Sequence, residues 1–179
     1  MDVRRITKNA ILLALLCVTG MFAIPMGENV KVSLQLLTLF LIFGVTDKLL
    51  DKILIPALYL LLGLIMPIYA GFQAGITPTF GFVISFVIIP IPFHFLYKYI
   101  KLNFYFRYII SCLVCLIIVY LCGSIFMMIY LNIDYGKALL FSVVPYIGFD
   151  ILKIAICTVA IKLIPDSMKT SQRSEQHDQ

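Results

Sequence analysis

The chain has 179 residues, of which 62% are hydrophobic and only 13% are charged, and its net charge is +5. A water-soluble domain is about half apolar and about a quarter charged, and a chain of this length cannot bury so much apolar surface in one core. The composition therefore excludes a soluble enzyme and a nucleic-acid-binding protein. It predicts a small all-α membrane protein surrounded by lipid, with room for about six spans of roughly 20 residues each.

Six apolar runs, separated by charged residues, glycine or proline, mark the expected helices. They cover residues 9–24, 32–45, 53–69, 76–97, 108–131 and 138–164. These runs are expected to be helical because every backbone N–H and C=O in lipid needs a partner within the protein. Residues 1–164 would thus form one six-helix transmembrane domain. Residues 165–179 show no apolar period and are expected to form a disordered cytoplasmic tail.

The lysine and arginine residues indicate how these helices are oriented. With six spans, eleven of the fourteen fall on one side: Arg4, Arg5, Lys8, Lys48, Lys52, Lys98, Lys101, Arg107, Lys162, Lys169 and Arg173. Lys31 and Lys137 fall on the other side, and Lys153 lies inside a span. Because lysine and arginine accumulate in cytoplasmic loops, the N- and C-termini are both expected to be cytoplasmic.

The last expected span contains two charged residues near its middle. Asp150 and Lys153 are three residues apart and share one helix face, with Tyr146 one turn earlier on that face. Pro145 and Gly148 are expected to loosen the helix there. Charged groups inside a membrane are expensive and usually functional, which favours a site for a ligand with both donor and acceptor groups. The alternative is a self-neutralising ion pair that joins helices.

Three other patterns have both a functional and a purely structural interpretation. The uncharged, aromatic connection 69–82 is either backbone packed over a cavity or an ordinary tight turn. Gln35 and Thr38 share a face of the second expected helix and either bond to neighbouring helices or contact a ligand. Ala10 and Ala14 allow another helix to approach closely, from the same chain or from a partner.

No sequence pattern predicts catalysis. The five cysteines, including Cys112 and Cys115, lie in apolar runs without a neighbouring histidine or carboxylate, and cysteine in such a setting behaves as a small hydrophobic residue. The sequence also has no metalloprotease motif and no nucleotide-binding loop. The protein is therefore expected not to be an enzyme, and to have no catalytic residues, no metal site and no cofactor.

Six segments are distinctive when taken together and in order: Ala10-x-x-x-Ala14, Val32–Phe40, Leu58–Leu64, Pro67–Phe72, Thr77–Phe82 and Pro145-Tyr146-x-Gly148-x-Asp150-x-x-Lys153. With them the chain resembles the biotin-specific BioY family of substrate-binding (S) components of energy-coupling factor (ECF) transporters. The motif from Pro145 to Lys153 and the Pro-Thr-x-Gly turn are the motifs most specific to this family. Many members have a longer, more glycine-rich third loop, and in this chain Gln73 is expected to supply the polar group there.

The resemblance implies a high-affinity biotin-binding subunit of an ATP-driven vitamin importer, multi-pass in the plasma membrane of a prokaryote. Residues 1–164 would be its substrate-binding domain. The implied partners are a transmembrane scaffold subunit, which would dock on Ala10 and Ala14, and two ATPase subunits that supply the energy. An S component for lipoate or thiamine, or a solitary ion-coupled carrier that uses Asp150 and Lys153 as a relay, remains the alternative.

The chemistry of biotin suggests how it would be held. Its ureido ring offers two N–H donors and a carbonyl, and its chain ends in a carboxylate. Asp150 would accept from the ureido N–H groups, and Lys153 would donate either to the ureido carbonyl or to the carboxylate. A small pocket with few fixed polar groups is the usual form of such a site. The expected biotin contacts are Asp150, Lys153, Gln73, Gln35, Tyr146 and Phe72.

Overall fold

The computed structural model describes residues 3–25 and 31–164. In chain order these form α1 (Val3–Met21), β1 (Ala23–Pro25), β2 (Lys31–Ser33), α2 (Gln35–Val45), α3 (Leu49–Ile65), α4 (Phe80–Ile88), α5 (Pro90–Tyr99), α6 (Phe104–Leu131), α7 (Tyr135–Ser142) and α8 (Ile147–Leu163). The all-α prediction is confirmed for every long element, and the strands form only a three-residue antiparallel hairpin. The tail predicted to be disordered, 165–179, lies outside the described residues.

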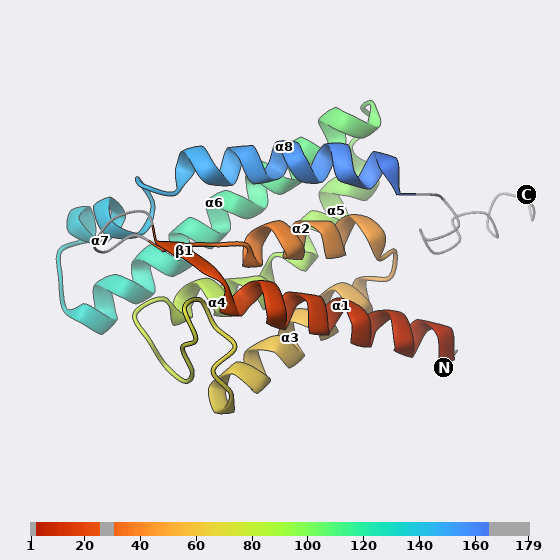
Figure 1. Ribbon diagram of the computed structural model, residues 1–179. Helices are drawn as coiled ribbons and strands as arrows, with labels where there is room; N and C mark the ends of the chain where they lie inside the picture. Colours follow the sequence, from red (N-terminus) through yellow and green to blue (C-terminus); the bar gives the residue numbers. More distant parts are fainter. Residues whose placement is uncertain (1–2, 26–30, 165–179) are drawn as a thin grey trace, which may run out of the picture.

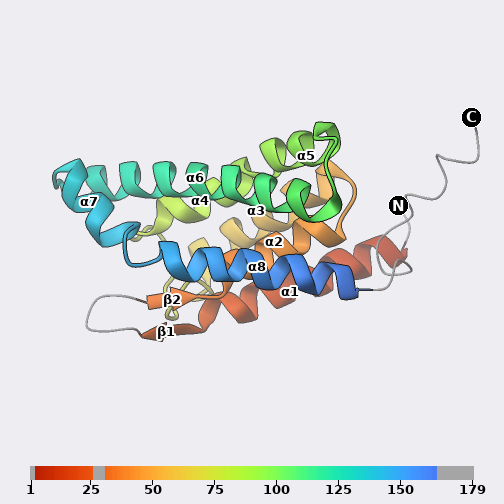
Figure 2. The same ribbon diagram turned by 90° about the horizontal axis from the view of Figure 1, so that it is seen from above.

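The helices form an elongated bundle with two distinct ends (Figures 1 and 2). The start of α1, the end of α8 and the α2–α3 and α5–α6 connections lie at one end, which we call the basic end (Figure 1). The hairpin, α7 and the α3–α4 connection lie at the other, which we call the hairpin end (Figure 1). Phe80–Tyr99 and Phe104–Leu131 are each long and apolar enough to cross a membrane. The bent pair of α7 and α8, with an angle of 47° between the two helices, makes a third such segment when it is taken as one span.

Most helices begin or end at other residues than the predicted apolar runs, and the reasons can be identified. The fourth run is divided between α4 and α5 at Pro90, because proline has no N–H to continue the helical hydrogen bonds. The sixth run is divided between α7 and α8 on either side of Pro145, at the position where loosening was expected. The first connection, for which the sequence indicates no element, contains the hairpin, and α2 starts only at Gln35.

The basic end is held together by a buried carboxylate. Asp51, in the first turn of α3, accepts hydrogen bonds from Arg5 Nε (2.8 Å) and Nη2 (2.7 Å) and from Asn9 Nδ2 (2.8 Å). Lys8 Nζ donates to the carbonyl oxygen of Val45 at 3.0 Å. These bonds tie α1 to the α2–α3 junction, where α3 begins at Leu49, before the expected apolar run. We call Arg5, Asn9 and Asp51 the basic-end clamp.

Candidate ligand-binding pocket

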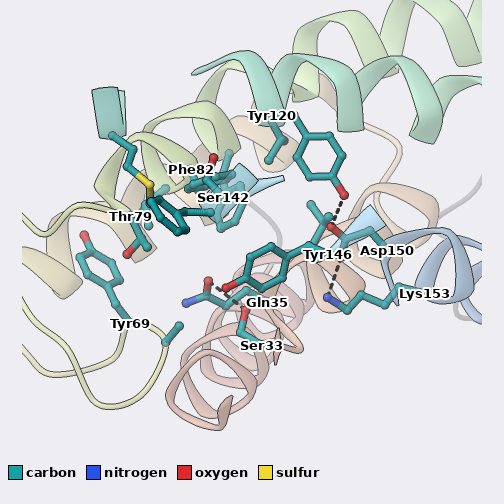
Figure 3. Close-up of a pocket in the computed structure, with 17 residues that line it drawn as sticks. Ser33, Gln35, Tyr69, Thr79, Phe82, Tyr120, Ser142, Tyr146, Asp150 and Lys153 are labelled. Carbon is teal, nitrogen blue, oxygen red and sulfur yellow. Dashed lines mark hydrogen bonds and ion pairs between the residues drawn. The ribbon is translucent and has the colours of Figure 1, made fainter. Parts of the chain in front are cut away.

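A pocket of about 120 Å³ lies toward the hairpin end, between β2, α2, the α3–α4 connection, α4, α6, α7 and α8 (Figure 3). Apolar side chains of α4 and α6 form much of its wall, namely Phe82, Val83, Phe86, Val119 and Met127. The polar and charged residues that line it are Ser33, Gln35, Tyr69, Thr79, Tyr120, Ser142, Tyr146, Asp150 and Lys153. An apolar wall with a few polar groups is typical of a small-molecule site.

The charged part of the pocket is a three-residue cluster that joins α6 to α8. Lys153 Nζ lies 2.7 Å from Asp150 Oδ1, and Tyr120 donates its hydroxyl to Asp150 Oδ2 at 2.6 Å (Figure 3). Asp150 is only 4% exposed and Lys153 only 7%. Both carboxylate oxygens are thus held in place, yet each keeps a lone pair, and the lysine keeps two further N–H donors. The cluster therefore presents acceptors and donors side by side.

Gln35 is oriented by a second hydrogen-bond chain. Tyr59, which is fully buried, donates its single hydroxyl hydrogen to the carbonyl oxygen of Ile68 at 2.9 Å. The phenol oxygen must therefore accept from the Gln35 amide at 2.5 Å, which identifies that amide atom as nitrogen. The amide oxygen of Gln35 then lies 3.4 Å from Ser33 Oγ. Gln35 consequently both joins helices and contributes an acceptor to the pocket wall.

The structure brings together four of the six residues that were expected to bind ligand. Gln35, Tyr146, Asp150 and Lys153 line the pocket, whereas Gln73 and Phe72 are not among its lining residues. The bonds that the Gln73 backbone makes with Tyr69, and the left-handed φ of 59° at Phe72, set the loop conformation. In that conformation the Phe72 side chain is 62% exposed and packs edge-on against Phe22. Tyr69, Ala70 and Thr79 are the loop residues in the wall.

Sequence reasoning missed the most informative polar partners. Tyr120 lies within the continuous apolar run of α6, where an aromatic residue with a polar tip gives no separate signal. Ser142 ends α7 next to the break before α8, and only the finished fold turns it toward α4. Thr38, which shares a helix face with Gln35, does not line the pocket and donates to Thr19 of α1 at 2.9 Å.

Ala10 and Ala14 do not line the pocket and lie on an outward face of α1. Both are exposed, and Ile6 and Val18, four residues before and after them, are 53% and 48% exposed. Spacing of four residues puts all of them on one side of the helix. This face, here called the alanine face, is not covered by the described part of the chain.

Comparison with known proteins identifies the family. The model of the BioY family matches residues 1–170. The chain belongs to the BioY family. This confirms the family indicated by the sequence motifs. Because the chain combines a BioY sequence with long apolar helices, this BioY protein is a membrane protein.

Two curated relatives and one solved structure are similar to this BioY chain over most of its length. "Biotin transporter BioY" of Thermotoga maritima is 29% identical over 166 residues, covering 89% of this chain and 95% of the relative. "Biotin transporter BioY2" of Lactococcus lactis is 28% identical over 159 residues, 86% of each chain. The crystal structure of the S component for biotin from an ECF-type ABC transporter shares the fold, with a TM-score of 0.77, 24% identity and coverage of 90% and 93%.

Proposed function

We propose that this BioY protein is the biotin-binding S component of an ECF-type importer and that it captures and delivers its ligand without catalysing a reaction. The names of its family and relatives support this role. The observation that carries the proposal is the cluster of Tyr120, Asp150 and Lys153 inside an otherwise largely apolar pocket. The ureido ring of biotin presents N–H donors beside a carbonyl, which matches adjacent acceptors and donors, and its thiophane ring and chain suit an apolar wall.

The proposed contacts follow from this match. Asp150 accepts from the ureido N–H groups, and Lys153 donates to the ureido carbonyl. Gln35 offers its amide oxygen, and Tyr146 packs against the apolar part of the ligand. Gln73 and Phe72 are the proposed outer contacts, since they follow the lining residues Tyr69 and Ala70 in the loop.

Titration calorimetry of the purified protein in detergent tests the ligand. Biotin is expected to give a saturable heat with one site per chain, and lipoate and thiamine are expected to give none. Heat with lipoate or thiamine but not with biotin would make the protein an S component for another vitamin. The absence of heat with all three would contradict the proposed role.

We further propose that the protein crosses the plasma membrane of a prokaryote six times, with both termini cytoplasmic. The proposed spans are α1, α2, α3, α4 with α5, α6, and α7 with α8. Two features support an even number: α1 starts and α8 ends at the same end of the bundle (Figure 1), and Arg5, Lys52 and Arg107 lie on segments of that end. Alkaline phosphatase fused after residue 132 should be active in cells, and fused after residue 164 it should be inactive.

The energy would come from a transmembrane scaffold subunit that docks on the alanine face, together with two ATPase subunits. The double substitution Ala10→Leu and Ala14→Leu should reduce co-purification of the scaffold by about ten- to one-hundred-fold, because added methylenes in a close helix contact cost about 1–3 kcal/mol. Biotin affinity should not change, because no residue of α1 lines the pocket. Ala155→Leu, an exposed alanine on α8, is the matched control.

Loss of biotin affinity in the double variant, or equal loss of co-purification in Ala155→Leu, would contradict docking on the alanine face. Uptake of labelled biotin by cells that lack the ATPase subunits gives an independent check. We expect no ATP-driven uptake there. Vigorous uptake would instead favour the solitary ion-coupled carrier that uses Asp150 and Lys153 as a relay.

A further inference from the structure

One side of the basic end carries four cations, which we call the cationic corner: Lys98, Lys101, Arg107 and Lys162. They lie on the end of α5, the α5–α6 connection, the first turn of α6 and the end of α8, all at the basic end of the bundle (Figure 1). Both ion pairs formed among the described residues lie elsewhere, in the basic-end clamp and in the pocket. The corner therefore has four positive charges that no described carboxylate pairs with.

The carboxylates of the basic end are engaged on its other side. The basic-end clamp holds Asp51, and Asp47, in the α2–α3 connection, is attracted by Lys8 and Lys52. The other carboxylates that the structure describes belong to the cap of α7 and to the pocket. The side formed by α5, α6 and α8 is thus left with a net positive charge.

Within the corner, the Arg107 side chain is held in a position suited to an anion. Its Cζ lies 4.1 Å from the centroid of the Tyr97 ring, and this stacking restricts where the guanidinium can move. Its Nε is buried and makes no hydrogen bond to any other described residue, although buried donors nearly always have a partner. A guanidinium can bond two oxygens of one phosphate group at once. An anionic group from outside the described chain therefore fits this position.

The surface around the corner suits a lipid better than a small free anion. Tyr99, Leu102 and Phe106 are exposed, and Lys162 Nζ lies 4.8 Å from the centroid of the Tyr105 ring. Aromatic side chains collect at the level of the lipid headgroups, and basic pockets between transmembrane helices bind the headgroups of anionic lipids. A phospholipid would cover the exposed apolar side chains as well as the charges, whereas inorganic phosphate would cover only the charges.

We infer that the cationic corner binds one anionic phospholipid, whose phosphate bonds to the Arg107 guanidinium. Lys98, Lys101 and Lys162 add to the attraction, and the lipid chains pack beside the exposed side chains of α5 and α6. The inference depends on insertion of the protein in a membrane and not on the identity of the vitamin. It gives the basic end a binding site of its own, separate from the pocket.

The chain has no tryptophan, so Tyr99→Trp provides a single fluorescent reporter at the corner. The protein is placed in phosphatidylcholine vesicles that contain increasing amounts of brominated phosphatidylglycerol or, separately, brominated phosphatidylcholine. Phosphatidylglycerol should quench the reporter at about a tenfold lower mole fraction, because each lysine or arginine attracts anionic lipid by roughly a factor of five. Ile65→Trp, an exposed position at the end of α3, should be quenched equally by the two lipids.

Arg107→Gln in the reporter chain should remove most of this selectivity. Lys48→Gln is the matched control, because Lys48 is an exposed lysine at the same end of the bundle but beside the basic-end clamp. It should leave the selectivity unchanged. Lys98→Gln with Lys101→Gln alters only exposed side chains, so it should reduce the selectivity without lowering the melting temperature.

Three results would overturn the inference. Equal quenching of the Tyr99→Trp reporter by the two lipids would show that the corner does not select anionic lipid. An equal loss of selectivity in Lys48→Gln and Arg107→Gln would show diffuse attraction to the whole basic end in place of a site. Displacement of phosphatidylglycerol by millimolar inorganic phosphate would make the corner a site for free anions.

Discussion

Asp150→Asn should weaken biotin binding by about one-hundred-fold and should also lower the melting temperature of the ligand-free protein. The substitution keeps the shape of the side chain but removes the charge that Lys153 and Tyr120 both contact. Hydrogen bonds to charged groups are worth about 1.5–3 kcal/mol each, and the loss also leaves the lysine as an uncompensated buried charge. Calorimetry measures the affinity, and thermal unfolding in detergent measures the stability.

The basic-end clamp supplies the matched control. Asp51→Asn makes the same chemical change in another buried carboxylate, one that is bonded to Arg5 and Asn9. It should lower the melting temperature while leaving biotin affinity unchanged, because the clamp lies at the end of the bundle remote from the pocket. If both variants lost affinity equally, the effect of Asp150 would be one of general stability and would not depend on ligand contact.

Local sequence was enough to predict the charged half of the pocket. In an apolar run any ionisable residue is conspicuous, and a spacing of three residues places Asp150 and Lys153 on the same helix face whatever the rest of the fold does. The same helical period also predicts that Tyr146, four residues before Asp150, lies on that face. Lys153 therefore lies 2.7 Å from Asp150 without any long-range contact being needed to bring them together.

The other half of the pocket depends on contacts between segments that are distant in the sequence. Tyr120 reaches Asp150 across thirty residues of sequence, and in a helix as largely apolar as α6 no period marks which tyrosine faces inward. Ser142 gains its place in the pocket only because the chain bends by 47° between α7 and α8. The loop residues Gln73 and Phe72 illustrate the same limit, since their side-chain directions depend on left-handed φ values at Gly71 and Phe72. Composition indicated an uncharged loop near a cavity, but not which side chains face it.

A triple variant, Asp150→Leu with Lys153→Met and Tyr120→Phe, should abolish biotin binding while keeping the ligand-free protein as stable as wild type or more so. Replacing a buried ion pair by apolar residues of similar size is often neutral or stabilising by about 1–4 kcal/mol. Removing the tyrosine hydroxyl at the same time leaves no donor without its acceptor. The two substitutions in α8 and the one in α6 therefore remove the cluster as a unit.

The single variant Lys153→Met is the control, because it leaves Asp150 buried with only the hydrogen bond from Tyr120 and should be clearly less stable than the triple variant. A cluster that served only to join α6 to α8 would give a triple variant that still binds biotin. A triple variant that fails to fold would show that the ion pair supplies net stability. We expect the triple variant to fold but not to bind biotin. That result would show that the two buried charges serve ligand binding and not stability.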